Sequence, residues 1–315
     1  MIIFHDPHCA EYSAPGYPER PERITRTVPL LKDRHCDWEW HEPRAATDEE
    51  LLRAHSREHL ARIAAATNDF DSDTPAYPNI DTYARQSAGA AIEAERASLC
   101  GEHTFCLMRP PGHHATRDRA MGFCYFSNVA VAALDALAVA GAGDAGSEPD
   151  KHSRSTPKAF GAATTKTGVE RVAIWDFDAH HGNGTEAIVA NNPRIRFASI
   201  HQFPAYPGTG MKSFANIDNY PVAPFTRRNE HVDVAKHALE KLIAFKPELI
   251  LVSAGFDAYA RDPLVQMTLE REDFATFGEW LRKIDIPTAA ILEGGYSNEL
   301  PELIEAFLAS WMGEV

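Results

Sequence analysis

Two aspartates and a histidine at alternate positions, Asp176, Asp178 and His180, are the residues whose types and spacing point most directly to chemistry. They follow an apolar run at residues 172–175 that has the character of a strand buried on both faces. Side chains in a strand alternate with period two, so the three would point the same way if the extended conformation persists. Carboxylate oxygens and an imidazole nitrogen that converge at a strand end suit a metal ion.

Two simpler interpretations compete with a catalytic metal site at this point. A calcium loop of the EF-hand type would need glycine at its sixth position, which is His181, and glutamate at its twelfth, which is Ala187. The other is a purely structural turn, because Gly182 and Gly184 allow the chain to turn tightly into a following helix. The sequence of this segment argues against calcium and leaves the structural turn open.

Four further polar segments follow predicted strands and should lie along one edge of a sheet. They are PPGHHA, SIHQFPAYPGTG, SAGFDAYARDPL and LEGGY, at residues 110–115, 199–210, 253–264 and 292–296. Asp257 follows an apolar strand just as Asp178 does, so it can supply the third ligand of an Asp, His, Asp set. Three protein ligands with open positions are typical of a catalytic zinc, whereas four close a structural one. A lone aspartate in such a loop is usually a turn or a helix cap, so this assignment depends on the first cluster.

Histidines and a tyrosine in these loops could transfer protons and donate a hydrogen bond. His113 and His114 follow a Pro-Pro-Gly turn, and histidine is the side chain best suited to exchange protons near neutral pH. Tyr296 follows two glycines, and its phenol could donate a hydrogen bond to a developing oxyanion. The two histidines could instead simply face the solvent, and Tyr296 could be an ordinary half-buried tyrosine at the end of a strand. Phe123 and Tyr206, likewise, are more often core aromatic residues than walls of a substrate tunnel.

The elements that must position these residues alternate between strand and helix. We predict strands at residues 1–4, 103–108, 171–177, 196–200, 249–254 and 288–292, a helix that begins near residue 22, and helices at 48–53, 58–65, 82–99, 129–140, 186–190, 232–245, 272–284 and 299–311. This alternation predicts an α/β fold in which one open parallel sheet carries helices on both faces. In such sheets ligands bind at the carboxyl ends of the strands, where the polar segments would lie.

The composition indicates a single soluble domain over residues 1–315. The chain is 44% hydrophobic, which is enough for a large core. No segment is apolar for long enough to cross a bilayer, and the N-terminus lacks the basic region of a signal peptide. Five cysteines without a CxxC pair argue against a disulfide framework, so a cytoplasmic location is expected. Residues 141–168 are rich in Gly, Ala, Ser and Thr without periodicity, which predicts an exposed, mobile loop.

Taken in order, these motifs resemble those of the zinc-dependent histone deacetylase family, amidohydrolases of the arginase/deacetylase fold. The motifs are RPPGHHA (109–115), MGFCYFSNVAVAA (121–133), DFDAHHGNGTE (176–186), YPGTG (206–210), SAGFDAYARDPL (253–264) and LEGGY (292–296). The resemblance extends from the YPERPERI loop, at residues 17–24, to Tyr296. It is closer to class II deacetylases and their bacterial relatives than to class I, because Asn183 stands where class I enzymes have aspartate.

The resemblance implies two metal ions. A catalytic zinc would be held by Asp178, His180 and Asp257, where it would act as a Lewis acid and activate a water. A structural potassium would lie beside it. The potassium ligands would be the backbone of Asp176, Asp178 and His180, the side chain of Ser199 and the backbone of Ile200. Iron or cobalt could replace zinc in a site of this kind.

The resemblance also implies the catalytic roles. His114 would be the general base, His113 would be held by Asp176, and Tyr296 would polarise the acyl carbonyl. Asn183 would orient His114 as a neutral partner, which stabilises an imidazolium less than a carboxylate does and so leaves His114 more readily deprotonated. Relatives with histidine in place of the tyrosine remove acetyl groups poorly, so the presence of Tyr296 favours activity.

Substrate contacts follow from the same resemblance. Asp73 aligns with a loop aspartate that grips the substrate backbone in related enzymes. Gly122, Phe123 and Tyr206 would line the substrate tunnel. Leu264 stands where a polyamine-selective relative carries a glutamate, which favours acyl-lysine over acetylpolyamine.

The expected function is removal of an acetyl or acyl group from an N-acylated amine. The substrate would be acyl-lysine or, alternatively, an acetylpolyamine or another small amide. The formal net charge of −14 favours cationic substrates and disfavours nucleic acids and anionic membranes as partners. A ureohydrolase of the same fold would need two manganese ions and further aspartates in place of His113, His114 and Tyr296. A catalytically weak acyl-lysine binding protein would have lost a zinc ligand or the tyrosine, and assembly into a homo-oligomer stays open.

Overall fold

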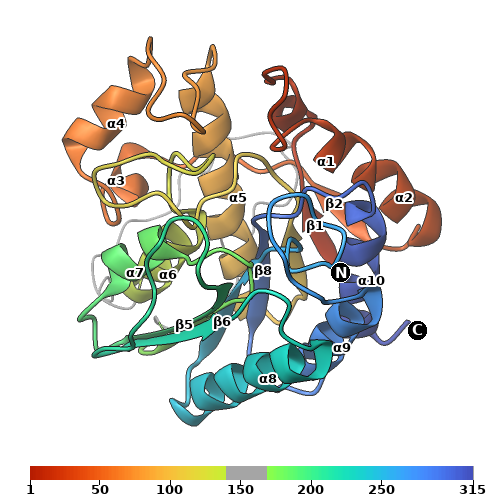
Figure 1. The fold of residues 1–315 in the computed structure, drawn as a ribbon. Helices are drawn as coiled ribbons and strands as arrows, with labels where there is room; N and C mark the ends of the chain where they lie inside the picture. Colours follow the sequence, from red (N-terminus) through yellow and green to blue (C-terminus); the bar gives the residue numbers. More distant parts are fainter. Residues whose placement is uncertain (140–168, 315) are drawn as a thin grey trace, which may run out of the picture.

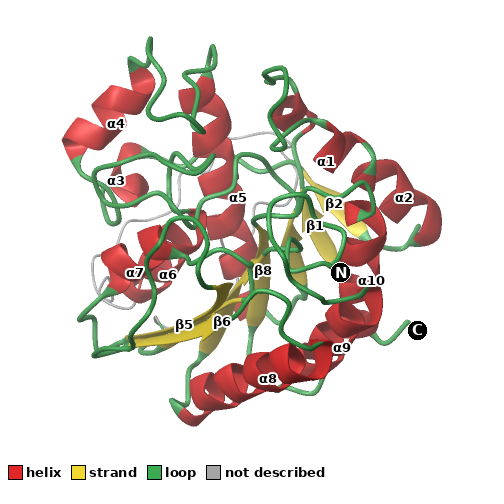
Figure 2. Ribbon diagram, in the orientation of Figure 1, coloured by secondary structure: helices red, strands yellow, loops and turns green. Residues whose placement is uncertain are grey.

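Eight strands form one parallel sheet in the computed structural model, which describes residues 1–139 and 169–314 (Figure 2). The strand order is β2-β1-β3-β8-β7-β4-β5-β6, and every neighbouring pair is parallel. The strands are β1 (Ile2–Phe4), β2 (Glu39–His41), β3 (Thr104–Cys106), β4 (Val172–Asp176), β5 (Ile195–Gln202), β6 (Ile217–Val222), β7 (Leu249–Ala254) and β8 (Thr288–Leu292). The predicted open parallel sheet is confirmed. The loop predicted to be mobile, residues 141–168, lies outside the described residues.

Helices cover both faces of the sheet (Figure 1). They are α1 (Glu22–Thr25), α2 (Thr27–Arg34), α3 (Asp48–Leu51), α4 (Arg57–Ala64), α5 (Ile80–Leu99), α6 (Asn128–Val139), α7 (Asn183–Val189), α8 (Arg228–Ala244), α9 (Arg271–Arg282) and α10 (Leu300–Met312), with a 3-10 helix at Pro7–Ala10. Helices α5 and α6 pack on one face, and α8, α9 and α10 lie on the other with α2 beside α10. Within the described ranges, no helix combines the length and apolarity that a membrane crossing requires.

The central strands are where the sequence prediction was most accurate. Every residue of β4, β7 and β8 is buried. A strand covered by helices on both faces reads as a continuous apolar run, so its position can be recognised without knowledge of its neighbours. Burial of each large aliphatic side chain contributes roughly 1.5–3 kcal/mol, which fixes these strands in the middle of the sheet.

Two edge strands were not predicted, and both depart from this pattern. Strand β2 is partly exposed along its length. Strand β6 has the sequence IDNYPV, in which Pro221 cannot donate to a ladder. Proline and polar residues are tolerated there because β6 is hydrogen-bonded to β5 on one side only. The local sequence therefore gives little indication that these segments are strands. Pairing of β2 with β1 and of β6 with β5 decides their conformation.

The strand order reverses its direction at β4, and this reversal defines the position for a site. From β4 the chain proceeds to β5 and then β6 on one side, whereas β7 and β8 lie on the other side of β4. Ligands in open α/β sheets bind at such a reversal, beyond the carboxyl ends of the strands. The first candidate metal ligands follow β4, and the third follows its neighbour β7.

Candidate active site

The three predicted metal ligands converge in the structure. Potential ligand atoms of Asp178, His180 and Asp257 all lie within 4.8 Å of one another, and all three residues are buried. His180 Nδ1 is 2.7 Å from Asp257 Oδ2 and 3.2 Å from Asp178 Oδ1. The arrangement brings two carboxylates and one imidazole to a single point at the carboxyl edge of the sheet.

The convergence has a different local cause from the one that strand periodicity suggested. Strand β4 ends at Asp176, so the extended conformation does not persist to His180. Instead, Asp176 Oδ1 accepts a hydrogen bond from the Asp178 amide (3.2 Å), and Asp178 Oδ1 accepts one from the His180 amide (2.8 Å). Carboxylates that bond the backbone two residues on form tight turns. Phe177 packs away from the site, with its ring centroid 5.3 Å from that of Phe277.

Two glycines allow the backbone to pack directly against the carboxylates. A Cβ on Gly255 would lie 2.0 Å from Asp178 Oδ2, and one on Gly294 would lie 2.5 Å from both Asp178 Oδ2 and Asp257 Oδ2. The Gly294 amide donates a hydrogen bond of 2.7 Å to Asp178 Oδ2. Because any side chain would displace an acidic oxygen, glycine is required at both positions for this geometry.

The electrostatics of the cluster favour a cation. Burial opposes the charged form of His180, yet Asp257 and Asp178 outweigh it and raise the pKa of His180 well above its ordinary value. Burial likewise opposes ionisation of Asp178, but His113 and His180 hold the pKa of Asp178 below its usual range. Buried carboxylates of this kind are stable only when positive charge lies beside them. The donor set of two oxygens and one nitrogen therefore fits a divalent metal such as zinc.

The paired histidines lie beside this cluster with opposite electrostatics. His113 Nδ1 is 3.1 Å from Asp176 Oδ2, and His114 Nδ1 is 2.8 Å from Asn183 Oδ1. Burial opposes protonation of His113, but Asp178 and Asp176 outweigh it and raise its pKa to about 10. Burial lowers the pKa of His114 well below its ordinary value, and the positive charges of His113 and His180 lower it further. The hydrogen bond with Asn183 acts in the opposite direction and raises the pKa of His114, so burial and the neighbouring positive charges are what keep His114 uncharged.

A cavity of about 190 Å³ opens beside the cluster. Its walls include all five residues predicted to contact substrate, together with three of the predicted catalytic and metal-binding residues. The lining residues are Asp73, His114, Gly122, Phe123, His180, Tyr206, Leu264 and Tyr296. The Phe123 ring lies 5.8 Å from that of Tyr296, and the Tyr206 ring is perpendicular to that of His114 at 5.1 Å. In the cavity wall, Phe123 thus packs against Tyr296, and Tyr206 packs against His114.

Gly122 is part of this wall for a steric reason. Its φ of +57° is in the left-handed region, and a Cβ there would lie 2.6 Å from His114 Cδ2 and 3.0 Å from Tyr206 Cε1. A larger residue would push one ring out of position.

Two buried carboxylates near the site were not singled out from the sequence. Glu293 Oε2 accepts hydrogen bonds from the amides of Gly112 (2.6 Å) and His113 (3.0 Å). Asp262 Oδ2 accepts one from the Tyr296 amide at 2.7 Å. Both residues stand inside the LEGGY and SAGFDAYARDPL motifs, so their position in a motif was the available signal.

An arginine from the other end of the chain also supports Tyr296. Arg23, in α1, donates a hydrogen bond of 2.8 Å to the Gly295 carbonyl oxygen and another to the Glu293 carbonyl oxygen. Its guanidinium lies 5.1 Å from the centre of the Tyr296 ring. Nothing in the local sequence of Arg23 indicates this contact, because it depends on how α1 packs against the loop after β8.

Three of the residues predicted for the potassium site lie on the neighbouring strands β4 and β5, and the other two, Asp178 and His180, follow β4. Asp176, the last residue of β4, pairs in register with Ser199 of β5. Ser199 and Ile200 are buried, and Ser199 Oγ is 3.0 Å from His201 Nδ1.

Comparisons with known proteins identify the family. The model of the histone deacetylase domain matches residues 17–142 and 159–311. A "probable deacetylase" of Methanothermobacter thermautotrophicus is 31% identical over 95% of this chain and 86% of that protein. A "histone deacetylase-like amidohydrolase" of Pseudomonas aeruginosa is 33% identical over 91% of this chain and 74% of that protein.

Solved structures show the same architecture. The HDA15 HD domain superimposes with a TM-score of 0.84 at 27% identity, covering 99% of this chain and 91% of that chain. An acetylpolyamine aminohydrolase from Burkholderia pseudomallei gives 0.83 at 24% identity, covering 99% and 98%, and this likeness concerns the fold alone. The chain belongs to the histone deacetylase family of deacetylases and amidohydrolases.

Proposed function

We propose that this protein is a zinc-dependent amidohydrolase that removes acetyl or acyl groups from acyl-lysine. The observation that carries the proposal is the convergence of Asp178, His180 and Asp257 beside a cavity whose walls include His114 and Tyr296. A binding protein would need the aromatic walls but would have no use for three buried metal-ligating side chains beside a neutral histidine.

The three converging residues would hold the metal. When bound, zinc supplies a Lewis acid for the acyl carbonyl and lowers the pKa of a water. The chain's own contribution is to fix the two carboxylates: the Gly294 amide donates to Asp178 Oδ2, and the Ala179 amide donates to Asp257 Oδ1. These contacts hold the ligands in place before substrate arrives.

His114 has the properties of the general base. Its Nδ1 donates to Asn183 Oδ1, which leaves Nε2 as the unprotonated nitrogen. Because burial keeps His114 neutral, Nε2 can accept a proton from the attacking water and later return it to the leaving amine nitrogen. His113, kept charged by Asp178 and Asp176, adds a fixed positive charge beside the reacting groups.

Tyr296 has the properties of an oxyanion donor. Burial raises its pKa well above the ordinary value, although Arg23 opposes the shift, so the phenol stays protonated. Its hydroxyl can then donate a hydrogen bond to the carbonyl oxygen as negative charge develops there.

We also assign a potassium ion to the backbone of Asp176, Asp178 and His180 with Ser199 and Ile200. The pairing of Asp176 with Ser199 in adjacent strands supports this proposal. Such an ion would stabilise the turns after β4 on which the metal ligands depend.

Leu264 favours acyl-lysine over an acetylated polyamine. It lines the cavity with 39% of its surface exposed, and it offers no charge to a second ammonium group. The test is the hydrolysis of a matched pair of substrates, an acetyl-lysine peptide and acetylputrescine, by the zinc-loaded protein. We expect the higher kcat/KM on the peptide. A preference for acetylputrescine would reverse the substrate assignment, and hydrolysis of neither would refute the proposed function.

A further inference from the structure

The loop that brings Gly122 and Phe123 to the active-site cavity is a hairpin with a strained tip. Met121 and Cys124 pair across it, and the amide of each donates to the carbonyl oxygen of the other at 3.0 Å. Both tip residues have positive φ, +57° at Gly122 and +67° at Phe123, as a two-residue turn of type I′ requires. A bulky side chain rarely adopts this conformation, which persists only where the surrounding structure holds it. We call residues 116–127 the wall hairpin, because its tip forms part of the cavity wall.

The tip of the wall hairpin touches the two side chains that are proposed to react. A Cβ at Gly122 would lie 2.6 Å from His114 Cδ2, so the Gly122 backbone already lies against the ring of the proposed base. The Phe123 ring centroid is 5.8 Å from that of Tyr296, the proposed oxyanion donor. The position of the hairpin therefore limits where both of these rings can lie.

Two buried histidines hold the base of the wall hairpin. His55, in the turn before α4, has Nδ1 at 3.0 Å from the Thr116 carbonyl oxygen, and its Nε2 accepts a hydrogen bond of 2.9 Å from the Ser127 amide. One imidazole ring thus joins the two ends of the hairpin. His59, in α4, donates from Nε2 to the Tyr125 carbonyl oxygen at 2.8 Å. The two rings stack on each other, with their centroids 5.0 Å apart.

The hydrogen bonds of His55 determine its protonation state. The Ser127 amide can only donate, so Nε2 of His55 carries no hydrogen, and the Thr116 carbonyl oxygen can only accept, so Nδ1 carries one. Burial lowers the pKa of His55 to about 3, and the neighbouring His59 lowers it further. The ring is therefore neutral near pH 7 and keeps both bonds.

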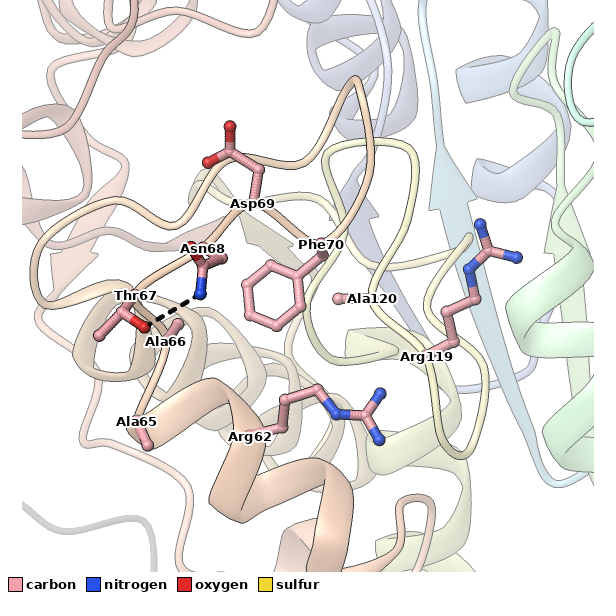
Figure 3. Close-up of a pocket in the computed structure, with 9 residues that line it drawn as sticks. All are labelled: Arg62, Ala65, Ala66, Thr67, Asn68, Asp69, Phe70, Arg119 and Ala120. Atoms are coloured by element: carbon pink, nitrogen blue, oxygen red, sulfur yellow. Dashed lines mark hydrogen bonds between the residues drawn. The ribbon is translucent and has the colours of Figure 1, made fainter.

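The outer side of the same junction is more open to solvent. A depression of about 370 Å³ lies there, and its lining residues include Arg62 of α4 and Arg119 of the wall hairpin (Figure 3). Arg62 Nη1 donates to the Asp118 carbonyl oxygen at 3.1 Å, but Arg62 is exposed, so water can replace this bond. His55 and His59 are both fully buried. The loss of their bonds would leave buried backbone groups of the hairpin without a partner.

We propose that His55 and His59 are positioning residues, which hold the wall hairpin in its strained conformation and through it place His114 and Tyr296 for amide hydrolysis. Neither histidine lines the cavity, so both act through the hairpin and not on the substrate. The kinetic consequence of this inference rests on the proposed function, whereas the order of the hairpin can be measured without a substrate.

The kinetic experiment compares His55→Leu with His55→Gln and with His231→Leu. His231 is the matched control, because it is also buried but lies in α8, on the opposite face of the sheet from α6, which follows the wall hairpin. For zinc-loaded His55→Leu we expect kcat on an acetyl-lysine peptide to fall roughly tenfold at unchanged zinc content, with a smaller change in KM. Glutamine offers an oxygen and an NH2 group, so His55→Gln should recover part of this loss. His231→Leu should leave kcat unchanged.

Hydrogen exchange measures the wall hairpin directly, without a substrate. The amides of residues 116–127 should exchange faster in His55→Leu than in the wild type, while the amides of β7 keep their protection. His231→Leu should not change exchange in the hairpin. If His55→Leu does not fold, His59→Leu and His59→Gln make the same comparison at the Tyr125 carbonyl oxygen.

Three outcomes would overturn the inference. They are a wild-type kcat in folded, zinc-replete His55→Leu, an equal loss of kcat in His231→Leu, and unchanged exchange in the wall hairpin of His55→Leu. The proposed function fails by a different result, namely a wild-type protein that hydrolyses no acylated amine. In that case the exchange experiment still decides whether His55 orders the hairpin.

Discussion

Replacement of Asp262 by alanine tests whether this buried carboxylate acts by placing Tyr296. Asp262 Oδ2 accepts from the Tyr296 amide at 2.7 Å, and Oδ1 accepts from the Leu264 amide at 3.0 Å. The side chain is 7% exposed, so the Tyr296 amide would have no ready replacement acceptor. A buried donor left unsatisfied costs about 1–3 kcal/mol, which is the expected loss in unfolding free energy.

The kinetic effect should pass through the tyrosine hydroxyl. Loss of an oxyanion donor, as in Tyr296→Phe, costs on the order of 100- to 1,000-fold in kcat. Displacement of a catalytic group by about 1 Å can lower the rate on the order of 100-fold. A loss of that size in kcat, through a displaced Tyr296 hydroxyl, is therefore the largest that we expect for Asp262→Ala. In the Tyr296→Phe background no hydroxyl remains to be misplaced, so Asp262→Ala should then reduce kcat little further. The stability loss should persist in both backgrounds, because the amide is still orphaned.

The assay is a double-mutant cycle on four zinc-loaded proteins. Steady-state kinetics gives kcat, denaturant unfolding gives stability, and metal content is measured on each protein. Asp262→Asn, which keeps one acceptor oxygen, should fall between wild type and Asp262→Ala. Independent, multiplicative losses of kcat in the double variant would refute the reasoning, as would a wild-type kcat for Asp262→Ala alone.

Three further predictions address the base, the cavity wall and the core. His114→Ala should lower kcat at least as much as Tyr296→Phe while zinc content is unchanged, and a zinc-replete variant with near-normal kcat would remove His114 from the mechanism. Gly122→Ala should lower kcat/KM with little change in zinc content, because its Cβ would lie 2.6 Å from His114 Cδ2, and unaltered kinetics would show that the ring can yield freely. Burial lowers the pKa of His231 to about 4, below its unfolded value of about 6.5. The unfolded chain then binds the extra proton, so stability is complete above about pH 6.5 and falls by up to about 3 kcal/mol as the pH drops towards 4. Urea unfolding at several pH values should show this slope, and His231→Phe should flatten it; equal slopes for both proteins would contradict the assignment.

The sequence predicted most accurately the parts of the fold that carry their own signal. The run at residues 172–176 is buried on both faces, and its apolar sequence alone indicated a central strand. Strand β6, with Pro221, carries no such signal, because its conformation depends on pairing with β5. Long-range pairing is not visible in a local pattern, so edge strands were missed and central strands were found.

The same distinction applies to the site. The alternate spacing of Asp178 and His180 predicted that their side chains would lie together. The turns that place them, however, depend on hydrogen bonds from backbone amides to carboxylates, which the alternation of side chains along a strand does not predict. Asp262 and Arg23 act on backbone groups of distant segments. Every residue type carries the same backbone carbonyl, and all but proline carry the same amide. The partner of a side chain that bonds a distant backbone group therefore cannot be recognised by its residue type, and only the folded structure reveals the contact.

The central claim is that Asp178, His180 and Asp257 hold a catalytic metal, and a zinc titration of chelator-stripped protein tests it most directly. Amide hydrolysis should be absent in the stripped protein, rise in proportion to added zinc, and reach its plateau at a single equivalent per chain. Asp178→Ala should neither retain zinc nor recover activity at that plateau. Full hydrolysis by the stripped protein, or an Asp178→Ala protein that holds stoichiometric zinc and turns over substrate, would contradict the account.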